Sequence, residues 1–135
     1  MSADRWQRHD WWGVVLDAPD VRALAEFYAT LRGWRIHSVD EDDASLDVGE
    51  GVAYLAIQRN DAYVPPVWPS SADSQQMMLH LDFEVTDLAG ETRRAISLGA
   101  RQASYQPQDD VRVLLDPAGH PFCLYAADGP TDTTE

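Results

Sequence analysis

The residues of this chain best suited to chemistry are an imidazole and a thiol on two separate predicted strands. His80 lies in an alternating segment, residues 78–85, and Cys123 lies in another, residues 121–126. An imidazole and a thiolate are soft metal ligands, and they also make a nucleophile and base pair. The alternative is structural, with Cys123 as a small buried apolar residue and His80 as a hydrogen-bonded strand residue. Neither has a partner close in sequence, so both interpretations stay open at this point.

Strand alternation assigns these side chains to one face of their strands. Leu81, Phe83 and Val85 share a face that must pack against the helix that follows, which leaves the other face for a ligand. The residues predicted on this ligand-facing side are His80, Asp82, Glu84, Cys123 and Tyr125, together with Gly13, Val15, Asp17, Ala56 and Gln58. Tyr54 is predicted on the opposite side.

The elements that position these residues occur twice, 67 residues apart. Asp20 is matched by Asp87, and each aspartate precedes an amphipathic helix as a plausible N-cap. The chain then restarts a strand after Gly33 in the first half and after Gly99 in the second. The matching apolar triplets are Val14, Leu16 and Ala18, then Leu81, Phe83 and Val85. This order predicts an α+β fold of two tandem βαβββ modules, whose curved mixed sheets enclose a cleft.

The predicted organisation is a single domain over residues 1–135. Module one covers about 12–59, a Pro-rich linker covers 60–76, module two covers about 77–126, and a polar tail covers 127–135. Strands are predicted at 12–18, 34–39, 44–48, 52–59, 78–85, 100–105, 111–116 and 121–126, and helices at 21–31 and 87–98. In the turn over 116–121, Asp116 is predicted to hydrogen-bond its own turn backbone.

The charge and cysteine content exclude several classes of partner. A formal net charge of −13 opposes binding to nucleic acid or to an anionic membrane, because both carry dense negative charge. The first twelve residues lack the apolar run of a secretory signal, and no stretch is long enough to span a membrane. Cys123 is the single cysteine, which excludes an internal disulfide. These features predict a cytoplasmic protein.

Aromatic residues supply the other candidate contacts. Trp68, in the Pro-rich linker with Tyr63, either covers the cavity and stacks on a flat ligand or braces the loop. Three tryptophans near the N-terminus, Trp6, Trp11 and Trp12, are predicted to lie at or near a homodimer interface, because large exposed apolar groups favour a partner.

Several motifs resemble the vicinal oxygen chelate superfamily, which includes glyoxalase I, bleomycin-resistance proteins, fosfomycin-resistance proteins and extradiol dioxygenases. The matching segments are the strand-to-helix passage from Leu16 to Trp34, the string His80-Leu81-Asp82-Phe83, the triplet Leu98-Gly99-Ala100, and the ending Asp116-Pro117-Ala118-Gly119-His120-Pro121-Phe122-Cys123-Leu124. The likeness is strongest to the glyoxalase-like bacterial branch and covers roughly residues 13–126.

The resemblance implies where a metal would be held. The metal enzymes of the superfamily place ligands at points that correspond to Gly13, Ala56, His80 and Cys123. A hydrogen atom and a methyl group cannot bind a metal, so one imidazole and one thiol remain, fewer than the three protein ligands typical of catalytic zinc. The expected cofactor content is therefore none, with a divalent metal disfavoured.

Two functions follow from the resemblance. In the first, the protein binds a small, partly aromatic organic molecule in its cleft without a catalytic metal, as drug-sequestering members do. In the second, it is a metal-assisted lyase, isomerase or dioxygenase, with His80 as general base and Cys123 as ligand or nucleophile. The expected ligand contacts are hydrogen bonds from His80 and Gln58 and stacking by Tyr28, Tyr54, Trp68 and Tyr125.

Overall fold

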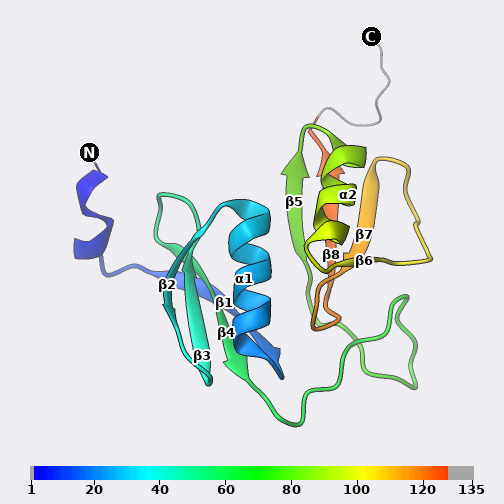
Figure 1. Cartoon of the computed structure of the whole chain (residues 1–135), viewed down its shortest axis with the longest axis horizontal. Coiled ribbons are helices and arrows are strands. Elements are labelled where there is room, and N and C mark those ends of the chain that lie inside the picture. The colour runs from blue at the N-terminus through cyan, green and yellow to red at the C-terminus, as the bar shows by residue number, and fades with distance from the viewer. Residues whose placement is uncertain (1, 128–135) are drawn as a thin grey trace. The chain divides into compact units, whose positions relative to one another are not determined.

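The computed structural model describes residues 2–127 of the 135-residue chain. The chain divides into two compact units between Tyr63 and Val64, within the segment predicted to link the modules. In each unit one α-helix packs on one four-stranded mixed sheet, and no closed barrel forms among the described residues (Figure 1). The predicted α+β class and the βαβββ order of both modules are confirmed.

The strands of the first unit lie in the order β1-β4-β3-β2. β1 pairs with β4 in parallel, and the other two pairings are antiparallel. Helix α1 lies along one face of this sheet, in contact with β2, β3 and β4 (Figure 1). The elements are the 3-10 helix η1 (Ser2–Gln7), β1 (Trp12–Ala18), α1 (Val21–Arg32), β2 (Arg35–Val39), β3 (Asp43–Asp47) and β4 (Ala53–Arg59).

The second unit repeats this arrangement with the order β5-β8-β7-β6. β5 and β8 are parallel, and the remaining pairs are antiparallel. Helix α2 contacts β6, β7 and β8. The elements are β5 (Leu81–Val85), α2 (Leu88–Ser97), β6 (Arg101–Gln102), β7 (Val111–Leu115) and β8 (Pro121–Ala126).

The 67-residue repeat is reproduced in the strand register. Val15 is paired with Ala56 in the first sheet, and the equivalent pair in the second sheet is Asp82 with Cys123. The helix caps repeat as well. The side chain of Asp20 accepts a hydrogen bond from the backbone N–H of Ala23 at 3.1 Å, and that of Asp87 accepts one from Gly90 at 3.0 Å. The two halves are therefore two copies of one structural unit.

Apolar side chains between helix and sheet form the core of each unit. Alternation within the strands buries one face and leaves the face opposite the helix more exposed. The buried residues of the first unit include Leu16, Ala18, Leu24, Phe27, Tyr28, Ala44, Leu46, Leu55 and Ile57. Those of the second include Phe83, Val85, Ala95, Val113, Leu114, Phe122 and Leu124. Polar side chains are consequently concentrated on the opposite faces.

Two predicted strands are shorter than expected by three residues or more. The strand predicted over 100–105 is formed only at Arg101–Gln102, and the one predicted over 78–85 begins at Leu81. In the first case the Gln106 side chain takes the place of a strand backbone. Its amide donates to the carbonyl of Val113 at 2.9 Å and accepts from the Val113 N–H at 2.9 Å. The backbone N–H and C=O groups of Val113 on β7 are therefore hydrogen-bonded without a longer β6.

No helix within residues 2–127 is long and apolar enough to cross a lipid bilayer. The tail predicted over 127–135 lies outside the described residues, apart from Ala127.

Candidate functional site

The second sheet gathers the chemically active residues that the sequence singled out. Phe83 and Val85 of β5 are buried towards α2, whereas Asp82 and Glu84 are exposed on the other face. On β8, Cys123 is half-buried beside Asp82, and Tyr125 is 36% exposed. The predicted alternation of both strands is therefore correct.

A cluster of three donor groups lies at the start of this face: His80, Asp82 and Cys123, referred to here as the module-two cluster. The imidazole Nε2 of His80 lies 3.1 Å from Oδ1 of Asp82. The thiol of Cys123 donates a hydrogen bond to the same carboxylate. The donor atoms of all three residues lie within 4.8 Å of one another. His80 and Cys123 therefore lie close together in the second module, and their catalytic role stays a prediction.

The environment of Cys123 favours the neutral thiol. Burial, and after it the negative charge and hydrogen bond of Asp82, raises the pKa of Cys123 to about 11. A reactive cysteine needs the opposite environment, since the thiolate is the nucleophile. In this arrangement Asp82 works against the nucleophilic role considered for Cys123.

On the first sheet, Tyr54 lies on the face that was predicted for Ala56 and Gln58. Residues 54, 56 and 58 alternate with the buried Leu55 and Ile57, so all three share the face opposite α1. The prediction that Tyr54 lies on the other side is wrong, because residues two apart on a strand share a face. Tyr54 is therefore available to a ligand on this sheet.

The Tyr54 ring lies directly over Gly13 of the neighbouring strand. A Cβ atom added at Gly13 would collide with this ring and would lie 2.6 Å from the Tyr54 carbonyl oxygen. A glycine is required here by this close approach of ring and backbone. One of the four metal-ligand points that the superfamily resemblance implies is thus occupied by an aromatic ring.

An aromatic pocket of about 270 Å³ lies on this face of the first unit. It is lined by Trp6, Trp11, His37, Ser45, Asp47 and Tyr54. The Trp6 ring is stacked between two others, with its centroid 5.3 Å from that of Trp11 and 5.3 Å from that of His37. Aromatic walls with few polar groups are typical of sites for small organic molecules.

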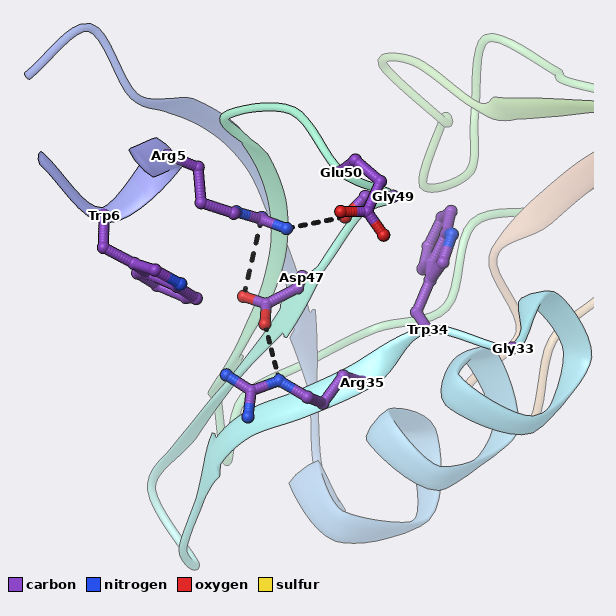
Figure 2. Close-up of a pocket in the computed structure, with 8 residues that line it drawn as sticks. All are labelled: Arg5, Trp6, Gly33, Trp34, Arg35, Asp47, Gly49 and Glu50. Carbon is purple, nitrogen blue, oxygen red and sulfur yellow. Dashed lines mark hydrogen bonds and ion pairs between the residues drawn. The ribbon is translucent and has the colours of Figure 1, made fainter. Parts of the chain in front are cut away.

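A second hollow of about 440 Å³ adjoins the aromatic pocket at Trp6 and Asp47. Figure 2 shows the Asp47 carboxylate between the side chains of Arg5 and Arg35. Its Oδ2 atom lies 3.0 Å from Nε of Arg35, and its Oδ1 atom lies 3.9 Å from Nη2 of Arg5. Arg5 also donates to the carbonyl of Gly49 at 2.7 Å. A buried carboxylate with two guanidinium neighbours therefore borders both hollows.

Tyr28, Gln58 and Trp68, which were also predicted to contact a ligand, lie in three different environments. Tyr28 is 0% exposed in the core beside Phe27, so it offers no surface to a ligand, and its assignment is corrected. The amide of Gln58 donates to Asp17 Oδ1 at 2.8 Å on the face opposite α1. The indole N–H of Trp68 donates to the carbonyl of Tyr105 at 3.2 Å, a contact that braces the linker.

Some residues of these sites were not identified from the sequence. Asp82 was placed on the correct face but was not considered as a third donor beside His80. A two-residue spacing on one strand was enough to find it. No local sequence pattern pointed to Asp47, Arg5 or His37, because their contacts join distant segments of the chain. The hydrogen bond from Arg5 to Gly49, for example, spans 44 residues. Trp6 and Trp11 were assigned to a dimer interface, and in the structure they line the aromatic pocket.

Comparison with known proteins identifies the family. A model of the glyoxalase-like domain matches residues 13–125, which is most of the chain. The chain therefore belongs to the glyoxalase-like domain family, within the vicinal oxygen chelate superfamily. No curated protein matches it.

Solved structures share the fold at low sequence identity. A glyoxalase/bleomycin resistance protein/dioxygenase family enzyme from Burkholderia phytofirmans PsJN has a TM-score of 0.64 at 18% identity, covering 84% of this chain and 95% of its own. The bleomycin-binding protein of Streptomyces verticillus, solved with copper(II)-bleomycin, has a TM-score of 0.55 at 21% identity, covering 89% of this chain and 98% of its own. A glyoxalase-related enzyme from Fulvimarina pelagi has a TM-score of 0.62 at 18% identity, covering 94% of this chain and 100% of its own.

The four-point metal site implied for the superfamily does not fit this chain. Gly13 and Ala56 carry no donor atom, and the Tyr54 ring covers Gly13. The module-two cluster supplies three donor groups, the number typical of catalytic zinc. The Asp82 carboxylate lies 3.1 Å from the His80 imidazole and accepts a hydrogen bond from the Cys123 thiol. The donor atoms all lie within 4.8 Å of one another, a spacing compatible with zinc ligands, which lie about 3.4 Å apart on a tetrahedron of about 2.1 Å bonds.

Proposed function

We propose that this protein binds a small, partly aromatic organic molecule without using a catalytic metal. The observation that carries the proposal is the aromatic pocket on the first sheet, where Trp11 and Tyr54 offer stacking surface beside the buried carboxylate of Asp47. Flat rings gain apolar burial and favourable ring geometry against such walls. The pocket, at about 270 Å³, is of a size to hold a compact ring system rather than a polymer.

The comparisons support the same class of function. The Streptomyces verticillus neighbour is a bleomycin-binding protein, so this fold is used to bind an organic molecule in at least one protein. Sequestration of such a molecule needs no metal ligand and no nucleophile from the protein. It is therefore compatible with Gly13 and Ala56 at the two donor-free positions and with a protonated Cys123.

Replacement of Trp11 by alanine is expected to weaken binding by about 1–3 kcal/mol, the worth of stacking one flat ring on an aromatic side chain. Binding would be measured by calorimetry with a panel of small aromatic compounds, after exhaustive chelation. Tyr105→Ala is the control, because Tyr105 is also a large aromatic residue, is 52% exposed and is absent from the pocket lining. Equal losses in both variants, or binding that disappears on chelation, would contradict the proposal.

A second candidate function is favoured by the module-two cluster. His80, Asp82 and Cys123, whose donor atoms lie within 4.8 Å of one another, could together hold a divalent metal for a lyase, isomerase or dioxygenase reaction. Elemental analysis of the purified protein decides between the two functions. A stoichiometric metal that is lost in His80→Ala, together with turnover of a hemithioacetal or a catechol, would replace the binding function with an enzymatic one.

We also propose a homodimer, with Trp12 as the leading contact residue. Trp12 is 61% exposed and Trp6 is 52% exposed, and exposed indoles of this size favour a partner surface. Light scattering at high protein concentration is expected to give twice the monomer mass, and Trp12→Ala is expected to shift the population towards monomer. A monomer at every concentration would exclude this association.

A further inference from the structure

We propose that the ligand of the aromatic pocket carries a planar cationic group, an amidinium or a guanidinium, which takes the place that Arg5 occupies beside Asp47. The inference rests on the proposed function, because it names the chemical class that the same site accepts. It goes beyond that function by assigning a charge to the ligand, a counter-ion to the site and a competing side chain to the protein itself.

Asp47 is the residue that gives the site its preference for a cation. It is 6% exposed, and it borders both the aromatic pocket and the adjoining hollow. A carboxylate buried to this degree is stable only when it is paired and hydrogen-bonded. A ligand that reaches Asp47 must therefore bring a positive charge or leave the carboxylate less well paired.

The aromatic residues beside Asp47 already accommodate a planar cation. The Cζ atom of Arg5 lies 5.0 Å from the ring centroid of Trp6 and 5.2 Å from that of Trp11. Both distances are within the range at which an indole attracts a guanidinium. A ligand cation at this point would meet the same two rings.

Arg5 itself is poorly matched to the position. Its ion pair with Asp47 is 3.9 Å long, compared with 3.0 Å for that of Arg35. Its Nε and Nη2 atoms are buried without a hydrogen-bond partner. Buried donors left in this way cost free energy, whereas an amidinium that is free to rotate can donate two parallel hydrogen bonds to one carboxylate. A ligand cation can therefore replace the Arg5 guanidinium with better geometry.

The surrounding charges support an exchange of one cation for another. The charged side chains that line the two hollows are Arg5, Arg35, Asp47 and Glu50, two of each sign. Replacing Arg5 by a ligand cation preserves this balance, whereas an anionic ligand in the place of Arg5 would face two carboxylates and one guanidinium. The net charge of −13 also raises the local concentration of cations around the protein.

The test compares two compounds of nearly equal shape, 2-naphthamidine and its neutral counterpart 2-naphthamide, by tryptophan fluorescence and calorimetry on the full chain. We expect the amidine to bind at least about tenfold more tightly, as a charge-assisted hydrogen bond to a buried carboxylate should provide. Equal affinities would overturn the inference and leave the proposed function standing. If neither compound binds, and Trp11→Ala weakens no aromatic ligand, the proposed function fails as well.

Three variants locate the effect. Asp47→Asn is expected to remove the preference for the amidine, whereas Asp43→Asn, the same change on the same face and strand of β3, is expected to keep it. Arg5→Gln removes the competitor and should tighten amidine binding several-fold more than it changes amide binding. It also tests the inference if Asp47→Asn does not fold. Equal effects of the two aspartate variants, or an unchanged amidine affinity in Arg5→Gln, would overturn it.

Discussion

Alkylation of Cys123 by iodoacetamide is expected to accelerate about tenfold per pH unit up to pH 10 without levelling off. The pKa of Cys123 is raised to about 11 from an ordinary value of 9.0, first by burial and then by the charge and hydrogen bond of Asp82. At pH 8 the thiolate fraction is then about 1 in 1,000, compared with about 1 in 10 for an unperturbed thiol, a difference of about 100-fold. Mass spectrometry of the folded protein measures the rate.

The contribution of Asp82 can be separated from that of burial. Asp82→Asn removes the negative charge beside the thiol, so the pKa of Cys123 should fall and alkylation at pH 8 should become faster. Glu84→Gln is the matched control, because Glu84 lies on the same face of β5 but is paired with Tyr125 instead of Cys123. A rate that levels off near pH 8, or an equal response to both variants, would show that Asp82 does not control the thiol.

The outcome bears directly on the choice between functions. A thiol that stays protonated at neutral pH cannot serve as a nucleophile, since the thiolate is the attacking species. A bound metal would reverse this, because a coordinating thiol loses its proton. A thiol that reacts slowly in the chelated protein, and is protected from alkylation on adding zinc, would therefore favour the second candidate function.

The fold could be predicted because its signals are local and occur twice. Asp20 and Asp87 each precede an amphipathic run, and their shared capping geometry follows from the sequence spacing. Strand alternation similarly placed Cys123 and Asp82 on one face. The length of β6 was overestimated because the Gln106 side chain makes hydrogen bonds that a strand backbone would otherwise make. Strand propensity does not predict such side-chain hydrogen bonds.

The aromatic pocket could not be predicted because it depends on contacts between distant segments. The residues that build it come from η1, the approach to β1, and three different strands, and no periodicity connects Arg5 with Asp47. From the sequence, the N-terminal tryptophans could be judged only by their expected exposure to solvent, and this favoured a dimer contact. Their packing against His37 is a tertiary contact, and tertiary contacts are decided by the whole sheet face rather than by the spacing of neighbours.

The second large effect is expected at Asp116, whose side chain is fully buried in the turn between β7 and β8. Its Oδ1 atom accepts hydrogen bonds from the backbone N–H groups of Ala118 at 2.9 Å and His120 at 3.0 Å, and the carboxylate lies 2.8 Å from the Nδ1 atom of His120. Asp116→Ala leaves these donors without an acceptor, at about 1–3 kcal/mol for each one that stays buried. The free energy of unfolding should therefore fall by about 2–4 kcal/mol.

Urea denaturation of three variants tests whether burial is the cause of this loss. Asp40→Ala is the matched control, because Asp40 accepts from the backbone N–H groups of Asp42 at 2.8 Å and Asp43 at 3.0 Å in an exposed turn, where water can replace the carboxylate. The bonds from Asp43 and then Asp42 hold the pKa of Asp40 below its usual value, so the interaction is present in both turns. Asp116→Asn keeps a side-chain oxygen for the two N–H groups and should recover part of the loss. If Asp40→Ala and Asp116→Ala destabilise equally, backbone hydrogen bonding by itself, independent of burial, sets the stability of these turns.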